Sequence, residues 1–410
     1  MRKILLAGCC FIGLIQSAKA NDLFTVTGVV NNGAQSQNIY DSFSSVQDLT
    51  NFLHNNSLSA LASSYTPVSG VNASVNYLGV PVLLSYTPNS TTLTFKVPGL
   101  GLSQSFTGAT RDDSDSQFLN YLKGQGQSLV NQLQKYLAGN SPISPVAGNP
   151  GSLQGMMISN QFSGGAMNTG ANATTGSATG GRFGIGVEAG EFSVQGFSGQ
   201  AYELPISYTY RFDNPRWQLQ FNLPLGYEQV GGARSYSAQF GVGLQIPLLP
   251  ETDWYLIPTV SAGATGSTDF GTAGVLYSGA LNSRYTWHAT DDLAVTLGDM
   301  VGQVSSVGVT IAGYNIDPGV SNTIVKNGLT AEYDTGWSWW GDEKISARAG
   351  VAYTSAWGTK LDIPNYTEVF LDFGTITGSD APFYKRLRIG GTFTFGEGYR
   401  AGSINFGYRF

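Results

Sequence analysis

The second half of the chain alternates apolar and polar residues with the period of two that a β-strand produces. In residues 202–212 the two faces separate fully, with Tyr202, Leu204, Ile206, Tyr208, Tyr210 and Phe212 against Glu203, Pro205, Ser207, Thr209 and Arg211. Residues 217–227 and 236–248 repeat the pattern. Each run is at least as long as the roughly 9–11 residues that a tilted membrane-crossing strand needs. The pattern predicts long antiparallel strands with one apolar face.

Similar runs continue to the end of the sequence. They lie at about 254–266, 275–288, 293–303, 307–316, 323–335, 343–357, 367–377, 385–396 and 400–410. The total of about twelve is an even number, which returns both ends of a closed barrel to one side, as in bacterial single-chain barrels. Residues 183–194 are also patterned and leave fourteen strands open.

The final strand points to a class of barrel. Ile404, Phe406, Tyr408 and Phe410 share one face, and the opposite face is polar or small. This stretch resembles the C-terminal strand of bacterial outer-membrane β-barrel proteins, which ends in an aromatic residue and is recognised by the barrel assembly machinery. The resemblance implies the outer membrane of a Gram-negative bacterium, with outer-membrane lipids and that machinery as partners. By architecture alone, the barrel is similar to autotransporter translocators and secretion-type barrels.

Tryptophans support membrane insertion. Trp217, Trp254, Trp287 and Trp357 fall at strand ends that we assign to the outer side, and Trp337 begins a cluster at an inner turn. Aromatic rings at strand ends are typical of the membrane interface, whereas a soluble β-sandwich buries its tryptophans within strands. We therefore favour a transmembrane barrel over a sandwich.

Residues 1–20 have the charged start, short apolar core and Ala-x-Ala end of a signal peptide. Residues 6–9 also resemble a lipoprotein processing box, but the apolar core before Cys9 is too short, so we favour ordinary cleavage. Both cysteines, Cys9 and Cys10, lie in this segment, and the mature protein is expected to have no cysteine chemistry.

Residues 21–139 predict a small α+β domain, which we expect on the periplasmic side. Strands are indicated at 23–30, 71–78, 80–86, 92–97 and 102–106, and helices after Ser45 and Ser114, each with a capping residue followed by an apolar stripe. The Gly139 and Pro142 pair is expected to end the second helix. Residues 140–181 are rich in Gly, Ser, Asn and Pro. We favour a flexible tether there over a segment that plugs the barrel of residues 182–410.

Composition removes several functions. Charged residues make up 12% of the chain and its formal charge is −6, which gives no reason to expect nucleic acid as a partner. No mature run approaches the roughly 18 apolar residues of a membrane-spanning helix. No nucleotide-binding or HExxH motif is present.

Two groups of residues raise the question of chemistry. Asp112, Asp113 and Asp115 suggest calcium, but acidic residues are also favoured at a helix start, which we prefer. His288 lies near Ser283 and Asp291, yet a Trp-His pair at a strand end is more often an interface anchor, and His54 stands alone. We expect no enzyme activity, metal or cofactor.

Charged residues on the inward face are the candidates to line the lumen: Glu203, Arg211, Glu228, Arg348, Glu368, Asp372, Arg386, Arg388 and Arg409. Such residues either pair into a closed lumen or line a narrow wet pore. Two functions follow. We favour a transport or secretion pore whose N-terminal domain gates it or recruits an unknown cargo. The alternative is a non-conducting anchor that presents this domain as an interaction module.

Overall fold

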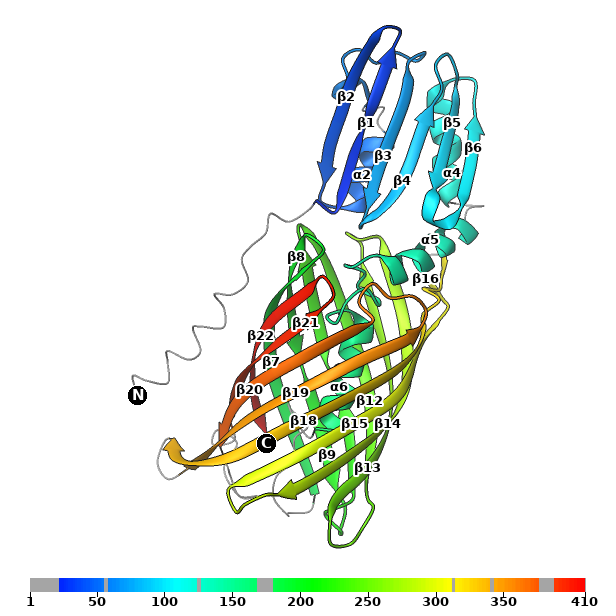
Figure 1. The fold of residues 1–410 in the computed structure, drawn as a ribbon. Helices are drawn as coiled ribbons and strands as arrows, with labels where there is room; N and C mark the ends of the chain where they lie inside the picture. Colours follow the sequence, from blue (N-terminus) through cyan, green and yellow to red (C-terminus); the bar gives the residue numbers. More distant parts are fainter. Residues whose placement is uncertain are drawn as a thin grey trace.

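The computed structural model describes residues 22–54, 58–123, 127–167, 180–311, 314–339, 343–375 and 387–409. The predicted signal peptide lies outside these ranges. The chain forms an N-terminal α+β domain that sits on one end of a β-barrel (Figure 1). The fold class expected from the sequence is therefore confirmed.

The N-terminal domain is built on one antiparallel sheet with the order β2-β1-β3-β4-β5-β6. Its strands are β1 Phe24–Asn32, β2 Gln35–Phe43, β3 Gly70–Tyr77, β4 Val80–Tyr86, β5 Thr92–Val97 and β6 Leu102–Thr107. Five of the six were expected. Strand β2 was missed because its sequence is mostly polar and does not alternate regularly, so only pairing with β1 reveals it.

Helices line one side of this domain. They are α2 Val46–His54, α3 Leu58–Leu61, η2 Pro98–Leu100, α4 Arg111–Lys123 and α5 Gln127–Asn140. Ser45 caps α2, since its hydroxyl accepts a hydrogen bond of 3.1 Å from the backbone N–H of Asp48. The second predicted helix begins a turn earlier than expected, because Thr110 and Asp113 form the capping box in place of Ser114.

The barrel closes through antiparallel pairing of its last strand with its first. Its elements are β7 Gly180–Val194, β8 Phe197–Leu204, β9 Ile206–Arg211, β10 Gln218–Asn222, β11 Leu225–Val230, β12 Ala233–Pro247, β13 Asp253–Ser267, β14 Thr272–His288, β15 Leu293–Val307, β18 Ser321–Trp339, β19 Glu343–Gly358, β20 Asn365–Thr375, β21 Leu387–Gly396 and β22 Tyr399–Arg409. Pro205 and Pro224 each interrupt one wall strand, since proline has no N–H for the ladder. Elements β8 and β9 are thus one strand, as are β10 and β11, which gives 12 barrel strands.

The predicted number of strands is right, but two errors cancel within it. Residues 183–194 belong to a full wall strand, β7, which the expected set of twelve left out. Residues 307–316 are instead a loop that carries β16 Val309–Ile311 and β17 Tyr314–Ile316, a two-stranded sheet apart from the barrel. Because β7 was left out, the expected direction of every following strand is reversed. The extra strand expected at residues 307–316 then restores the correct direction for the strands after it.

The tryptophan grouping was therefore wrong. We call the end where β7 begins and β22 ends the terminal rim, and the opposite end the domain rim. Strand directions place Trp217, Trp254 and Trp287 at the terminal rim together with Trp337, and only Trp357 of the expected outer group at the domain rim.

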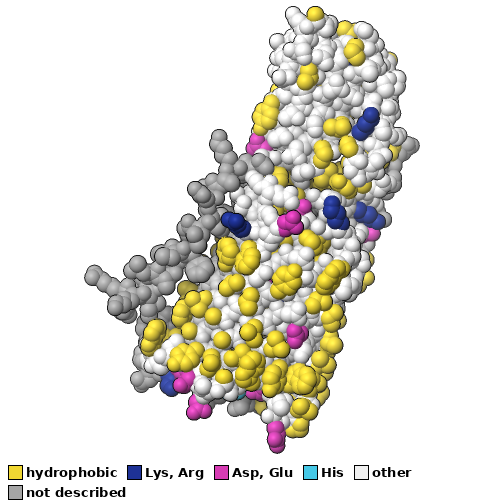
Figure 2. Space-filling model, in the orientation of Figure 1, with side chains coloured by type: hydrophobic (Ala, Val, Ile, Leu, Met, Phe, Trp, Pro, Cys, Tyr) yellow, Lys and Arg dark blue, Asp and Glu magenta, His cyan; other side chains and the backbone are white. Residues whose placement is uncertain are grey.

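The outer wall is apolar over most of its height. Figure 2 shows hydrophobic side chains over the lower barrel and charged ones mainly at its two ends. Examples of exposed apolar residues on the wall are Val187, Tyr208, Phe240, Val260, Tyr277, Val301, Leu329 and Val369. Outward apolar residues that alternate with inward polar ones are the mark of a transmembrane barrel. Within the described ranges, no helix is both long and apolar enough to cross a membrane.

Candidate functional site

A helix occupies the barrel lumen. Helix α6, Leu153–Gly165, lies inside the wall and packs on strands β12 to β15 (Figure 1). Ser152 caps it, with the Ser152 hydroxyl accepting from the backbone N–H of Gly155. The expectation of a flexible tether without a helix is wrong for these residues. Ten of the side chains or glycines of α6 are buried, and its apolar and polar residues do not separate into the stripe that would reveal an amphipathic helix.

Small residues make room for this helix. A Cβ on Gly263 would lie 2.9 Å from Leu153, one on Gly328 would lie 2.9 Å from the ring of Phe162, and one on Gly298 would lie 2.7 Å from the backbone oxygen of Ala166. The wall and the helix are thus fitted to each other at several levels of the lumen.

Polar contacts fix the position of α6. The Gln161 amide donates to the hydroxyls of Ser261 at 3.2 Å and Ser278 at 2.8 Å. Near the C-terminal end of the helix, Arg284 Nη1 donates to the carbonyl oxygen of Gly165 at 3.2 Å. A cation at this end also complements the helix dipole. Helix α6 therefore runs from near the domain rim toward the terminal rim.

One half of the lumen contains a compact ion-pair network. Arg348 donates two hydrogen bonds to Oδ2 of Asp372, from its Nε at 3.0 Å and from its Nη2 at 2.7 Å. Arg388 Nε donates to the other oxygen of Asp372, Oδ1, at 2.5 Å, and Arg388 Nη2 donates to Oε1 of Glu332 at 3.1 Å. Beside this network, the buried Lys326 pairs with Glu368. Each acid of this group has a basic partner.

The other half of the lumen has a different charge pattern. Glu188 on β7 lies directly opposite Glu203 on β8, and Glu228 on β11 lies nearby on the same wall. Glu188 accepts from the Ser403 hydroxyl at 2.6 Å, and Glu203 accepts from the Asn160 amide of α6 at 2.9 Å. Among the residues that the structure describes, none of these three carboxylates forms an ion pair with Lys or Arg.

A cavity of about 350 Å³ separates α6 from this wall. Its lining includes Glu188, Glu203 and Glu228, the face of α6 that carries Asn160, and the ring of Tyr399. The paired residues of the network, Lys326 with Glu368 and Arg348 and Arg388 with Asp372, border the same cavity, as does Arg182. Because α6 leans on β12 to β15, the free space lies toward β7, β8 and β20 to β22. The lumen is therefore filled on one side and hollow on the other.

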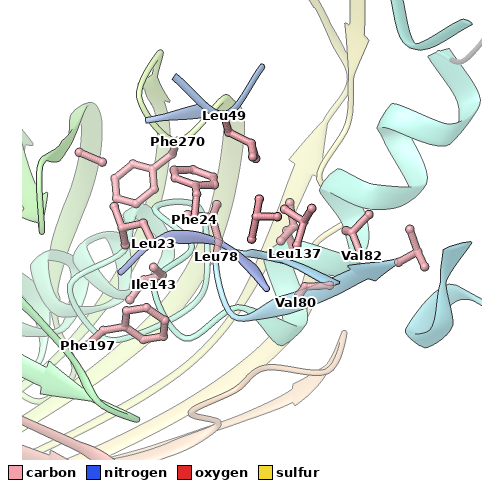
Figure 3. Packing of buried hydrophobic residues seen from close by; sticks show 14 of the residues in the cluster. Leu23, Phe24, Leu49, Leu78, Val80, Val82, Leu137, Ile143, Phe197 and Phe270 are labelled. Carbon is pink, nitrogen blue, oxygen red and sulfur yellow. The ribbon is translucent and has the colours of Figure 1, made fainter. Parts of the chain in front are cut away.

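The N-terminal domain is joined to the domain rim by one continuous apolar cluster. Leu23, Phe24 and Leu78 of the domain lie beside Phe197, the first residue of β8, and Phe270, in the turn between β13 and β14 (Figure 3). Phe24 and Phe270 each have 0% of their surface exposed. Burial of this kind is the main favourable term in association, so the domain and the barrel form a packed interface.

Polar contacts surround that interface. The backbone N–H of Val46 donates to the carbonyl oxygen of Asp269 at 2.8 Å, and the Gln134 amide donates to that of Gly271 at 2.8 Å. Lys135 of α5 lies 3.8 Å from Asp317. Burial acts to raise the pKa of Asp317, but hydrogen bonds from Gly319 and Ser306 and the charge of Lys135 outweigh it and leave the pKa below its usual value.

Most of the predicted lumen residues do face the lumen. The structure brings Arg348, Asp372 and Arg388 into one network, places Glu368 beside it, and puts Glu203 and Glu228 on β8 and β11, at the same cavity. Arg211 is buried near the terminal rim. Arg386 lies outside the described residues, as does Phe410 of the predicted assembly signal, and Arg409 is described only as part of β22. Ile404 and Phe406 lie on the outward face.

Sequence reasoning missed several lumen residues. Glu188 lies on the strand that was left out of the expected set, while Lys326, Glu332 and Arg284 sit at alternating inward positions that the strand pattern would have given. The polar residues of α6 gave no signal, since their segment resembles a linker.

The other candidate residues have local roles. Asp113 caps α4, and Asp115 accepts a hydrogen bond of 2.5 Å from the hydroxyl of Tyr86. Burial raises the pKa of Asp115. Ser283 accepts from the indole N–H of Trp254, and it lies on the opposite face of β14 from His288 because the two are five positions apart. Within the described part of the chain, no group of acidic residues, His and Cys is placed to hold a metal ion.

No family model and no curated protein matches the chain. Similar folds exist among solved structures. The β-domain of the Bordetella autotransporter BrkA aligns at 12% identity, with a TM-score of 0.42 over 56% of this chain and 98% of that one. The translocator domain of the autotransporter NalP from Neisseria meningitidis aligns at 13% identity, with a TM-score of 0.43 over 63% of this chain and 95% of that one. An outer membrane channel from Pseudomonas putida F1 aligns at 14% identity, with a TM-score of 0.38 over 57% and 96%.

These likenesses concern the barrel and assign no function. The fold and the lumen themselves define the class of protein: a closed 12-stranded β-barrel with an apolar outer wall. Within that class, this chain is distinguished by a helix in its lumen and a folded domain packed on one rim.

Proposed function

We propose that this protein is an outer-membrane anchor that holds its N-terminal domain at the cell surface, with α6 as the connection through the barrel. The path of the chain is the observation that carries the proposal. The chain leaves the domain at the domain rim, α6 descends the lumen, and the first wall strand then begins at the opposite rim.

The even number of strands supports the direction of display. In bacterial single-chain barrels it leaves both barrel ends on the periplasmic side. The terminal rim is then periplasmic and the N-terminal domain lies outside the cell. This proposal places the domain on the opposite side from the periplasmic one expected from the sequence, in which the lumen helix cannot be recognised.

The fit of α6 to the wall favours an anchor over an open pore. Gly263, Gly298 and Gly328 receive the helix at three levels, and Gln161 and Arg284 hydrogen-bond to hold it. A helix seated this way is a structural part of the barrel. A conducting pathway would have to run beside it.

A transport pore is the second candidate. The observation that favours it is the cavity of about 350 Å³ beside α6, which has polar and charged walls. In this role the domain at the rim would gate the passage or recruit cargo.

Epitope accessibility tests the proposed anchor. One variant carries a short epitope after Gly33, in the exposed turn between β1 and β2, and a matched variant carries it after Glu251, in the turn between β12 and β13 at the terminal rim. Antibody should label the Gly33 variant on intact cells, and the Glu251 variant only after the outer membrane is permeabilised. The reverse result would place the domain in the periplasm and overturn the proposal.

Planar-bilayer recording separates the two candidates. The folded full-length protein should show no steady conductance if it is an anchor whose lumen is closed by α6. Steady conductance by the intact chain, with surface labelling of the domain unchanged, would favour the pore.

A further inference from the structure

The acidic residues of the lumen fall into two groups, one with basic partners and one without. Between β18 and β21, each buried acid of the network meets a base: Glu368 meets Lys326, and Asp372 meets Arg348 and Arg388. On β7, β8 and β11, separated from β21 by β22, Glu188, Glu203 and Glu228 meet none within the described residues, although all three line the cavity, which the network residues also border. The difference is not explained by burial, since both groups face the same lumen.

With all three carboxyl groups ionised, this arrangement is costly without a cation. Glu188 and Glu203 occupy directly opposite positions on β7 and β8, where like charges repel. Their hydrogen bonds come from neutral groups, the Ser403 hydroxyl and the Asn160 amide. A positive charge between the strands and α6 would remove the repulsion.

Glu228 adds a separate indication of a ligand. Its residue is 6% exposed, and its Oε1 atom has no hydrogen-bond partner among the described residues, although Asn149 lies near the carboxylate. A buried carboxyl oxygen without a hydrogen-bond partner has a large desolvation cost. This carboxylate lines the same cavity as Glu188 and Glu203, so an occupant of the cavity can reach it.

The cavity also has an aromatic wall. Tyr399 is 4% exposed and stacks with Phe192 at a centroid distance of 6.1 Å, and both rings line the cavity. Carboxylates combined with aromatic faces are the groups that bind organic ammonium ions, through charge-assisted hydrogen bonds and cation–π contacts. A volume of about 350 Å³ is also at the lower end of small-molecule sites, which span roughly 300–1,000 Å³.

We propose that the cavity between α6 and strands β7, β8, β11 and β22 binds a small organic cation that carries ammonium groups, with Glu188, Glu203 and Glu228 as its anionic ligands. The ammonium groups sit among the three carboxylates, and the carbon chain lies against Tyr399 and Phe192. A single metal ion does not suit these residues, because no described set of three acidic, His or Cys side chains is close enough to share one.

Calorimetric titration of the folded full-length protein in detergent tests this site, with butane-1,4-diamine as the probe and sodium chloride and magnesium chloride at equal ionic strength as comparisons. The diamine should bind saturably, near one per chain, and sodium should not reproduce the heat. Glu228→Gln should weaken binding about ten-fold or more, as expected for loss of one buried charge-assisted contact. Glu251→Gln, an exposed acid in a turn at the terminal rim, should bind the diamine as the wild type does.

Glu188→Gln is a second variant, for the case in which Glu228→Gln does not fold, and it should also bind the diamine more weakly than the wild type. Heat-modifiable migration on gels shows whether each variant is folded. Absence of saturable diamine binding by folded wild-type protein would overturn the proposal. Equal affinity in the wild type and the folded lumen variants would do so as well, since the diamine would then sit elsewhere. Saturable binding of magnesium without binding of the diamine would overturn the proposal and identify a metal ion as the ligand.

Discussion

The hydroxyl of Tyr77, at the end of β3, donates a hydrogen bond of 3.1 Å to the backbone carbonyl of Phe270, in the barrel turn between β13 and β14. The two residues are 193 positions apart in the sequence. Tyr77 also packs edge-on against Phe24 at 5.1 Å, and burial raises its pKa, which keeps the hydroxyl protonated as a donor. This pair joins the N-terminal domain to the barrel through both a polar and an apolar contact.

The packing at this junction predicts how the domain can be detached. Phe270→Ala should destabilise the docked state by about 3–5 kcal/mol, because a fully buried ring is lost, whereas Tyr77→Phe should cost about 0.5–1.5 kcal/mol. Limited proteolysis, followed as release of the domain from the membrane fraction, measures the effect. Tyr40→Phe is the control, since Tyr40 is 63% exposed. Equal release from Phe270→Ala and Tyr40→Phe would contradict a packed junction.

The fit of α6 to the wall predicts a conductance change. Gly298→Val should displace the helix, because even a Cβ at this position would lie 2.7 Å from the backbone oxygen of Ala166. Gly279→Val is the matched control on the neighbouring strand, where a Cβ meets nothing within 4 Å. In planar bilayers, Gly298→Val should open more often or more widely than Gly279→Val. Identical traces from the two variants would show that α6 does not close the lumen.

The ion-pair network predicts a stability loss on breaking it. Asp372→Asn leaves Arg348 and Arg388 without the carboxylate they share, and removal of one partner from a buried pair typically costs about 3–5 kcal/mol. Urea unfolding in detergent should show a lower midpoint for this variant. Asp291→Asn, in an exposed turn, should keep the wild-type midpoint. An unchanged midpoint for Asp372→Asn would mean that the network does not stabilise the barrel.

Asp317 predicts a pH dependence of domain docking. The pKa of its carboxyl is lowered in the folded protein, so its contact with Lys135 stabilises docking above the unfolded pKa and is lost as the pH falls through the folded value. Proteolytic release of the domain should therefore increase on acidification below about pH 4, the usual range of a carboxyl group. Asp317→Asn should reduce this dependence, and an unaltered pH profile in that variant would assign the effect to other groups.

The last strand predicts a depth-dependent effect on assembly. Phe406 lies on the outward face opposite Val187 and Ile389. A charge near the membrane midplane costs up to about 2–4 kcal/mol, less for Asp than for Lys or Arg, and the substitution also removes an aromatic residue of the predicted assembly signal. Phe406→Asp should therefore abolish heat-modifiable insertion. Arg400→Asp lies on the same face of β22 but close to the domain rim, where the cost falls to about 0–1 kcal/mol. Insertion of both variants to the same extent would argue against a lipid-facing Phe406.

Local patterns in the sequence were enough for the class of fold. Alternation over residues 202–248 follows from the geometry of single strands, so it can be read without knowing which strands pair. The same alternation placed Arg348, Asp372 and Arg388 on the inward face. It did not reveal that two arginines share one carboxylate, because that depends on the register of β19, β20 and β21.

The sequence by itself determined a transmembrane-type β-barrel behind a small α+β domain, because period-two alternation and helix caps are local signals. Tertiary structure alone decided that α6 occupies the lumen and that the domain packs on the rim opposite the barrel ends. Helix α6 is held by tertiary contacts that its own sequence does not show, such as Phe162 against Gly328 and Asn160 with Glu203, so the segment resembles a linker. The direction of each barrel strand depends on how many strands precede it. One missed strand was therefore enough to assign Trp217, Trp254 and Trp287 to the wrong end of the barrel.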